Sequence, residues 1–467
     1  MKFGGKKLKW IGGLVGVVVA SLILVRLYVV WRNGTELERR LEALRAAGEP
    51  VKLSDLARAP IPADENAHEF LRSAATDLES IHRTLAQWYP EMIYPTGPMT
   101  DSEQDRMEAL FSGRPELLPL LEKAAACPDY DTQLNFKQPP SLLLAAFMDQ
   151  VLRHRDVTRV LRAHSALRLA QGRNDEALAD EVLTLRLTRH WSRDPLLIGY
   201  LVTTACEAVA IDGANRVLQT GSVSPAARQK LDAELALHDT LEGARGAMRT
   251  ELAYSLSSVA EMPDSSFCRI MGFDELLTLR YLDLYDRHVA NLARSRSELN
   301  TGKFSTLSPK NVFNIYERLV DLQDPTLEGV RTAADRVRAV SRSLRVLNAL
   351  QARVGTASDQ VPRLDELGLP ATALLDPFND EPLHVAKRPE GWMVYSVGLN
   401  GVDDGGSLDL GSDVGVGPIV SAAKNEADSG EEESPMLEGE DESEPAIVPK
   451  RSEGASPPAP SRSAGVD

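Results

Sequence analysis

The segment from Trp10 to Trp31 most limits what this chain can fold into, because its only charged residue is Arg26. An α-helix rises about 1.5 Å per residue, so about 20 apolar residues cross a hydrocarbon core of about 30 Å. Arg26 is close enough to one end for its long side chain to reach the lipid headgroups. Aromatic rings at both ends favour the membrane interface. The segment therefore predicts a transmembrane helix over residues 10–31.

The first nine residues carry only basic charges, on Lys2, Lys6, Lys7 and Lys9. Positive charge beside a span stays on the cytoplasmic side, so residues 1–9 are predicted to be cytoplasmic and the rest extracytoplasmic. This is the arrangement of a single-pass protein of the cell inner membrane, with the lipid bilayer as its first partner. A cleaved secretory signal is the rival interpretation. Its apolar run would be unusually long, and no small-residue cleavage site follows it.

Small residues repeat every fourth position within the span, at Gly12, Gly16 and Ala20. Small residues at this spacing make a flat face on which two membrane helices can pack closely. One interpretation is a homodimer that forms through this face. The other is an ordinary lipid-facing surface, because Gly and Ala are common in membrane spans.

The net charge of −16 argues against a nucleic-acid partner, because such proteins neutralise phosphates with Lys and Arg. The three cysteines, Cys127, Cys206 and Cys268, are far apart and form no CxxC pair. This argues against a structural zinc site and against a disulfide-built scaffold. It leaves open a single bridge between two of the three.

Residues after the span have the composition of a mainly α protein. Residues 32–62 predict a juxtamembrane helix, which ends near Gly48 and Pro50, followed by a proline-containing strap. Residues 63–362 predict a helical bundle or hairpin array, with the strongest helical spacing at 140–260. Further helices are expected at 308–320 and 327–354. The second of these is rich in Arg, and we expect it to be solvated and docked along one face.

One stretch of the helical block has the spacing of a helical hairpin. Ala163 and Ala166 let two helices approach, Gly172 turns the chain and Ala177 packs back. This stretch resembles one tetratricopeptide repeat. A repeat array needs several units in register to bury a continuous core, and the sequence shows only one. We therefore expect local packing of an α-hairpin here, with an array as the alternative.

Residues 363–406 predict a small module with a β-hairpin. Leu383–Ala386 and Trp392–Val397 are short alternating runs, and Pro389–Gly391 is the turn between them. The order Asp376-Pro-Phe378, Tyr395-Ser-Val-Gly398 and an acidic Gly-rich loop resembles the C-terminal end of the major pseudopilins of type II secretion. The N-terminus departs from that family, since it has no prepilin cleavage site. The overall layout resembles uncharacterised bacterial membrane-anchored helical proteins more closely.

The pseudopilin resemblance implies a calcium ion at the acidic loop. Calcium prefers oxygen ligands, which Asn400, Asp403 and Asp404 would supply. The alternative is a solvated acidic turn without a metal. Residues 407–467 are rich in Gly, Ser, Glu and Pro and have little apolar surface to bury, so a disordered acidic tail is predicted.

The sequence contains no GxSxG, GxxxxGK[ST], GxGxxG or HExxH motif, so we predict neither catalytic residues nor an organic cofactor. Glu207 and Asp212, on an apolar helix expected at 195–218, could line a cleft. A buried, paired carboxylate and a solvent-facing one are the more ordinary interpretations.

The leading functional hypothesis is a non-enzymatic, membrane-anchored scaffold or interaction protein that binds an unidentified envelope protein. One alternative is an envelope hydrolase whose site is assembled from scattered side chains. A deep cleft with facing carboxylates or a His–carboxylate pair would favour the hydrolase. The other alternative, suggested by the C-terminal hairpin, is an accessory protein of a secretion or pilus-like system.

Overall fold

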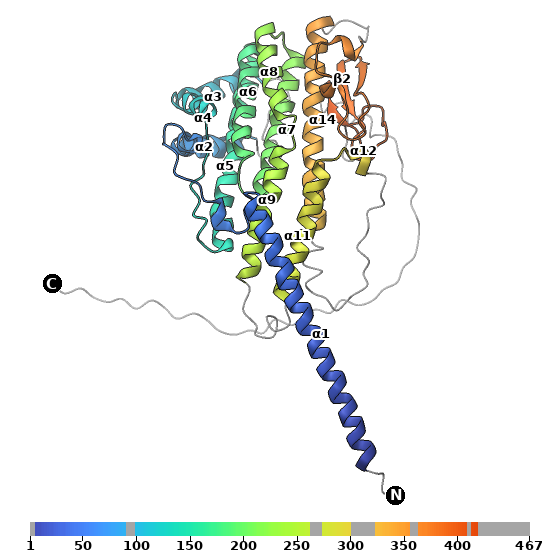
Figure 1. Ribbon diagram of the computed structural model, residues 1–467. Coiled ribbons are helices and arrows are strands. Elements are labelled where there is room, and N and C mark those ends of the chain that lie inside the picture. The colour runs from blue at the N-terminus through green and yellow to red at the C-terminus, as the bar shows by residue number, and fades with distance from the viewer. Residues whose placement is uncertain are drawn as a thin grey trace, which may run out of the picture. The chain divides into compact units, whose positions relative to one another are not determined.

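The computed structural model describes residues 5–89, 99–261, 273–299, 323–354, 363–408 and 412–418. These residues are mainly helical, and three short strands lie near the C-terminal end (Figure 1). The helix expected at 308–320 and most of the tail expected at 407–467 lie outside the described residues, as does Cys268.

The first helix, α1 (Gly5–Ala46), exposes most of the large apolar side chains that lie between Trp10 and Trp31. Among the residues that the structure describes, two helices are long and apolar enough to cross a membrane, α1 and α7 (Leu197–Thr220). None of the apolar window in α1 is buried, whereas 61% of the window in α7 is buried inside the protein. The helix α1 is therefore of the kind found in membrane anchors and signal sequences, and α7 is a core helix. After α1, Gly48 has a φ of +75°, which suits a glycine at a helix end.

The last turns of α1 are docked on the rest of the chain. Arg40 contacts both Asp283 and Asp286, each at 2.6 Å, on α11 (Phe273–Leu292). Three leucines of α1 pack against the apolar core between α11 and α9 (Glu242–Ala260): Leu37, Leu41 and Leu44. The apolar part of α1 therefore continues without a break into a segment that is fixed to the helical body.

Three helices form a layer against the middle of the chain. They are α2 (Ala67–Trp88), α3 (Asp101–Ser112) and α4 (Leu117–Ala126), and the short helix η1 (Leu53–Leu56) precedes them. They share an apolar core with α5 and α6. The largest buried side chains of this core include Ile81, Met107, Leu121 and Trp191. Burying each such side chain contributes about 1.5–3 kcal/mol, so this layer belongs to the same folded body.

The predicted helical block is present as consecutive helices. Besides α7 and α9 it contains α5 (Pro140–Ala170), α6 (Asn174–Trp191) and α8 (Pro225–His238). The α5–α6 turn has Gly172 at a φ of +73°, and the Ser165 hydroxyl donates to the Ala177 carbonyl at 3.0 Å. The α-hairpin expected at 163–177 is therefore confirmed as a local structure.

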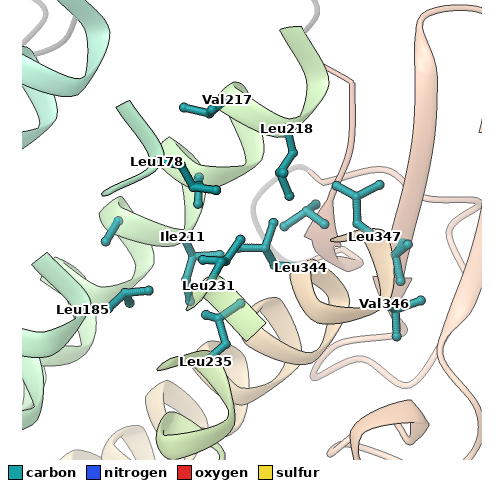
Figure 2. Close-up of a cluster of buried hydrophobic side chains, with 14 of the residues drawn as sticks. Leu178, Leu185, Ile211, Val217, Leu218, Leu231, Leu235, Leu344, Val346 and Leu347 are labelled. Carbon is teal, nitrogen blue, oxygen red and sulfur yellow. The ribbon is translucent and has the colours of Figure 1, made fainter. Parts of the chain in front are cut away.

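The largest apolar core lies where α6, α7 and α8 meet α14 (Asp324–Val354) (Figure 2). Leucine, valine and isoleucine side chains from the four helices point toward one another there. The labelled members are Leu178, Leu185, Ile211, Val217, Leu218, Leu231, Leu235, Leu344, Val346 and Leu347. The short strands pack on the same core, on the side of α14.

The expectation of a solvated α14 is wrong, because three of its arginines, Arg331, Arg342 and Arg345, are buried. Each has an acidic partner. Arg331 pairs with Asp335 at 2.6 Å, Arg342 with Asp239 at 2.9 Å and Arg345 with Asp232 at 2.8 Å. Guanidinium groups paired in this way can enter a protein interior that would otherwise exclude them.

The three strands form one antiparallel sheet in the order β1–β2–β3. The hairpin of β1 (His384–Arg388) and β2 (Gly391–Ser396) confirms the predicted module, with Arg388 opposite Gly391 at the turn. The third strand, β3 (Val414–Val416), lies within the segment that we expected to be disordered, so that expectation is wrong for residues 412–418. Pairing of β3 with β2 orders this piece, and a run of three residues is too short for its sequence to predict a strand.

A buried carboxylate anchors the turn before the hairpin. Asp376 is fully buried, and its oxygens accept from Phe378 N–H (2.8 Å), the Ser396 hydroxyl (2.8 Å) and Val397 N–H (2.9 Å). This ties the Asp-Pro-Phe turn to the end of β2. Three short helical segments complete the described chain: α12 (Arg296–Leu299), η2 (Leu364–Glu366) and η3 (Ala371–Leu374).

Candidate functional site

An open groove of about 820 Å³ lies where the end of α7 and the start of α8 meet α14 and the segment after η2. Its wall combines carboxamide, small and apolar side chains with a guanidinium. Lining residues include Val223, Arg228, Gln229, Asn348, Gln351 and Leu369. Ligand sites in proteins usually have volumes of about 300–1,000 Å³, and this groove is within that range.

Neutral amides hold the guanidinium of Arg228. One of its nitrogens donates to the Asn348 side-chain oxygen at 3.0 Å, and longer bonds of 3.4 and 3.5 Å reach the Gln351 side-chain oxygen. No carboxylate of the described residues forms an ion pair with it. Burial lowers the pKa of Arg228, against the opposing effect of the Asp175 charge. The groove therefore carries one positive charge that its own lining does not neutralise.

The acidic residue that lines the groove and two arginines beside the groove are paired. Asp232, which also lines the groove, contacts Arg345 at 2.8 Å. A second pocket of about 420 Å³ lies between α6 and the start of α8. Two arginines of its lining are paired, since Arg168 contacts Asp180 at 2.7 Å and Arg186 contacts Glu234 at 3.4 Å, and Lys230 also lines this pocket. Neither pair leaves a strong local charge for a ligand to meet.

A buried histidine, His238, lies between two glutamates. His238 Nδ1 is 2.9 Å from Glu207 and its Nε2 is 3.6 Å from Glu234, one helical turn earlier on α8. Burial lowers the pKa of His238, but the two carboxylates outweigh it and raise the value to about 9. The cavity that His238 and Glu207 line has a volume of only about 60 Å³.

A second buried cluster joins a tyrosine, a histidine and an aspartate. The Tyr130 hydroxyl is 3.1 Å from His154 Nε2, and His154 Nδ1 is 3.5 Å from Asp194. The His154 ring stacks on Trp191 with centroids 4.3 Å apart. Burial, helped by positive neighbours, lowers the pKa of His154 to about 3, and burial raises the pKa of Asp194 well above its usual range. The adjoining cavity measures about 20 Å³.

The two acidic residues singled out on the α7 sequence have different surroundings. Glu207 is buried against His238, and Asp212 faces solvent with its side chain 56% exposed. Asp212 contacts Arg162, which also reaches the buried Glu181 at 3.0 Å. Burial raises the pKa of Glu181 to about 7, against the opposing effect of Arg162. Glu207 is therefore the buried, paired carboxylate, and Asp212 is the solvent-facing one.

The predicted calcium ligands lie together on the loop that follows β2. The Asn400 amide donates to Asp404 at 2.8 Å, while Asp403 accepts from the Tyr395 hydroxyl at 3.1 Å and lies 3.3 Å from His384. Among the residues that the structure describes, no group of three or more His, Cys, Asp and Glu side chains could hold a metal ion. Calcium binding by Asn400, Asp403 and Asp404 remains a prediction.

The residues predicted for helix pairing in the membrane all belong to α1. Gly16 and Ala20 are exposed, and no atom lies within 4 Å of a Cβ placed on Gly16. Nothing is described of the surroundings of Gly12. The homodimer remains a prediction too. Of the cysteines, Cys127 and Cys206 are both free thiols.

The groove residues could not be predicted from the sequence. Arg228 and Asn348 are 120 positions apart and meet only because α8 packs on α14. The His238 cluster left a weaker signal, since Glu234 and His238 have the four-residue spacing that places side chains on one helix face. Comparison with protein-family models, curated proteins and solved structures found no significant match to this chain.

Proposed function

We propose that this protein is anchored in the bacterial inner membrane by α1 and binds an envelope partner with its extracytoplasmic helical body. The exposed apolar surface of α1 supports the anchor, and the lysines that precede it support a cytoplasmic N-terminus. Docking of Leu37, Leu41 and Leu44 supports a body held directly at the bilayer rather than on a flexible tether.

The observation that carries the binding role is the contrast between the groove and the buried His–carboxylate clusters. The groove of about 820 Å³ can accept part of another molecule. The clusters of His238 and His154 adjoin cavities of about 60 and 20 Å³. Since a cavity needs about 10–15 Å³ to hold one water, these cavities have room for on the order of one to a few waters, which is too little for a substrate. The small size of these cavities supports a structural role for the two clusters and leaves the groove as the binding surface of this proposal.

A hydrolase is the second candidate, and the Tyr130–His154–Asp194 line is what favours it. A hydroxyl, an imidazole and a carboxylate in sequence resemble the parts of a proton relay. The candidate requires the helices around Trp191 to open, since that indole is fully buried against His154. The third candidate is an accessory role in a secretion system. It rests on the turn anchored by Asp376 and on the hairpin that follows.

Site-specific photo-crosslinking in intact cells tests the binding role. The crosslinking amino acid replaces Ser222, an exposed residue at the lip of the groove, in the full-length protein. The matched control places it at Ser73, an exposed serine on α2 outside the groove lining. We expect one stoichiometric protein adduct from position 222 and none from position 73.

The possible adducts separate the three candidates. Equal adducts from both positions, or none from position 222, would contradict a binding role for the groove. Secretion components in the adduct would favour the accessory role. The hydrolase would be favoured if the protein hydrolyses an envelope substrate and His154→Ala abolishes this activity without lowering the melting temperature.

A further inference from the structure

We propose that the groove is a carboxylate-recognition site in which Arg228 receives a carboxylate group of the bound partner. The inference rests on the proposed binding role of the groove and adds the chemistry of what is bound. Three features support it: the contacts that hold the Arg228 guanidinium, the charges around this group, and the apolar wall of the groove.

The guanidinium of Arg228 is positioned without being neutralised. The side-chain oxygens of Asn348 and Gln351 accept its hydrogen bonds, and the Asn348 amide donates back to the Arg228 carbonyl at 3.0 Å. Asn348 and Gln351 are each only 4% exposed, so both residues are shielded from solvent. An arginine needed only for stability would gain more from a carboxylate, as Arg345 does with Asp232 on the same two helices.

The orientation of the Gln351 amide is evidence that a neutral side chain at position 351 is important. Its oxygen must face the guanidinium, because an amide N–H₂ group would repel it. This orientation leaves the Gln351 side-chain nitrogen buried without a hydrogen-bond acceptor among the described residues. A glutamate here would avoid that cost and pair with Arg228. The neutral amide keeps the charge of Arg228 available to the groove.

The charge and the lining of the groove favour a carboxylate over a phosphate. One uncompensated guanidinium matches one negative charge, and its planar fork fits the two oxygens of a carboxylate. A second negative charge would meet Asp232, whose own charge is already balanced by Arg345. Val223, Leu367 and Leu369 supply an apolar wall for the group that carries the carboxylate. A peptide C-terminus next to an apolar side chain has these properties.

Calorimetric titration of the full-length protein in lipid nanodiscs tests the proposal. The probes are N-acetyl-L-leucine, its uncharged amide N-acetyl-L-leucinamide, and inorganic phosphate. We expect the carboxylate to bind at least tenfold more tightly than either of the other two. Arg228→Gln should weaken carboxylate binding at least tenfold, whereas Arg83→Gln, which removes an exposed arginine on α2, should leave it unchanged.

Gln351→Glu provides a second variant that does not depend on losing the arginine. It places a carboxylate beside Arg228, so it should abolish binding of N-acetyl-L-leucine while keeping the melting temperature at or above that of the wild type. Equal affinities for acid and amide, tighter binding of phosphate, or full binding by Arg228→Gln would overturn the proposal. Partner capture from position 222 together with any of these results would leave the binding role standing and remove only its carboxylate chemistry.

Discussion

His238 lies 2.9 Å from Glu207 and 3.6 Å from Glu234, so one imidazole of α8 bridges carboxylates on two helices. This arrangement has a direct consequence for stability. The bridge is an ionic one only while the imidazole carries its proton, and the two carboxylates raise the pKa of His238 to about 9 against the effect of burial.

Stability should therefore fall on the alkaline side. The pKa of an unfolded histidine is about 6.5, so the folded state holds the proton more tightly between about pH 6.5 and 9. The contribution of His238 is fully present below pH 6.5 and is lost as pH rises to 9, by about 2–4 kcal/mol at most. Urea unfolding of the full-length protein across this range should show the decline.

The variant His238→Gln should lose this pH dependence, whereas His384→Gln, which changes a partly exposed histidine on β1, should keep it. The same alkaline slope in His238→Gln as in the wild type would contradict the ionic bridge.

Gly213 on α7 should be essential for packing, although glycine inside a helix is normally a weakness. A Cβ at this position would lie 2.1 Å from the Glu181 carboxylate and 2.3 Å from the Arg162 guanidinium, both of which are buried. We expect Gly213→Ala to lower the free energy of unfolding by about 1–3 kcal/mol, as overpacking does. The matched variant Gly246→Ala, where no atom lies within 4 Å, should raise it by about 1 kcal/mol. Equal effects of the two variants in urea unfolding would show that the close approach is unimportant.

Asp335 should be the most costly acidic residue of α14 to neutralise. It is fully buried and contacts Arg296, Arg331 and Arg338 within 3.3 Å. Asp335→Asn leaves these arginines without their shared charge and should cost about 3–5 kcal/mol. The control Asp365→Asn breaks an exposed pair with Arg363 and should leave the free energy of unfolding almost unchanged. A small loss at position 335 would mean that the arginines can find other partners.

Much of the fold could be predicted because its signals are local. The apolar run of α1, Gly48 and Gly172 with positive φ, and the Pro389–Gly391 turn each mark an element with neighbouring residues alone. The burial of α14 could not be predicted, since its arginines look solvent-facing until Asp232 and Asp239, about a hundred residues away, are brought to them. The contact between Arg228 and Gln351 could not be predicted either, because these residues are also far apart in the sequence. The strand β3 is short and acquires its structure only by pairing with β2.

Calcium binding at the acidic loop is a prediction with a simple test. Asn400, Asp403 and Asp404 are close together, although their oxygens now accept protein hydrogen bonds. If the loop binds calcium as extracellular modules do, about 1 mM calcium should raise the melting temperature of the full-length protein. Asp404→Asn should remove the effect, and Asp105→Asn, an exposed substitution on α3, should preserve it. An unchanged melting temperature would favour a loop closed by its own bonds, including those from Asp404 and Gly406 to Asp413.

The proposed function requires that α1 stays in the bilayer, with the helical body on the side opposite Lys2 and Lys6. The direct measurement is a fusion of alkaline phosphatase to the C-terminus of the full-length chain, combined with alkaline carbonate extraction of the membranes. We predict an active phosphatase, an uncleaved chain and retention in the membrane pellet. An inactive phosphatase would place the C-terminus in the cytosol and contradict the proposed orientation. A chain shortened after the apolar segment, or its release into the soluble fraction, would contradict the membrane anchor.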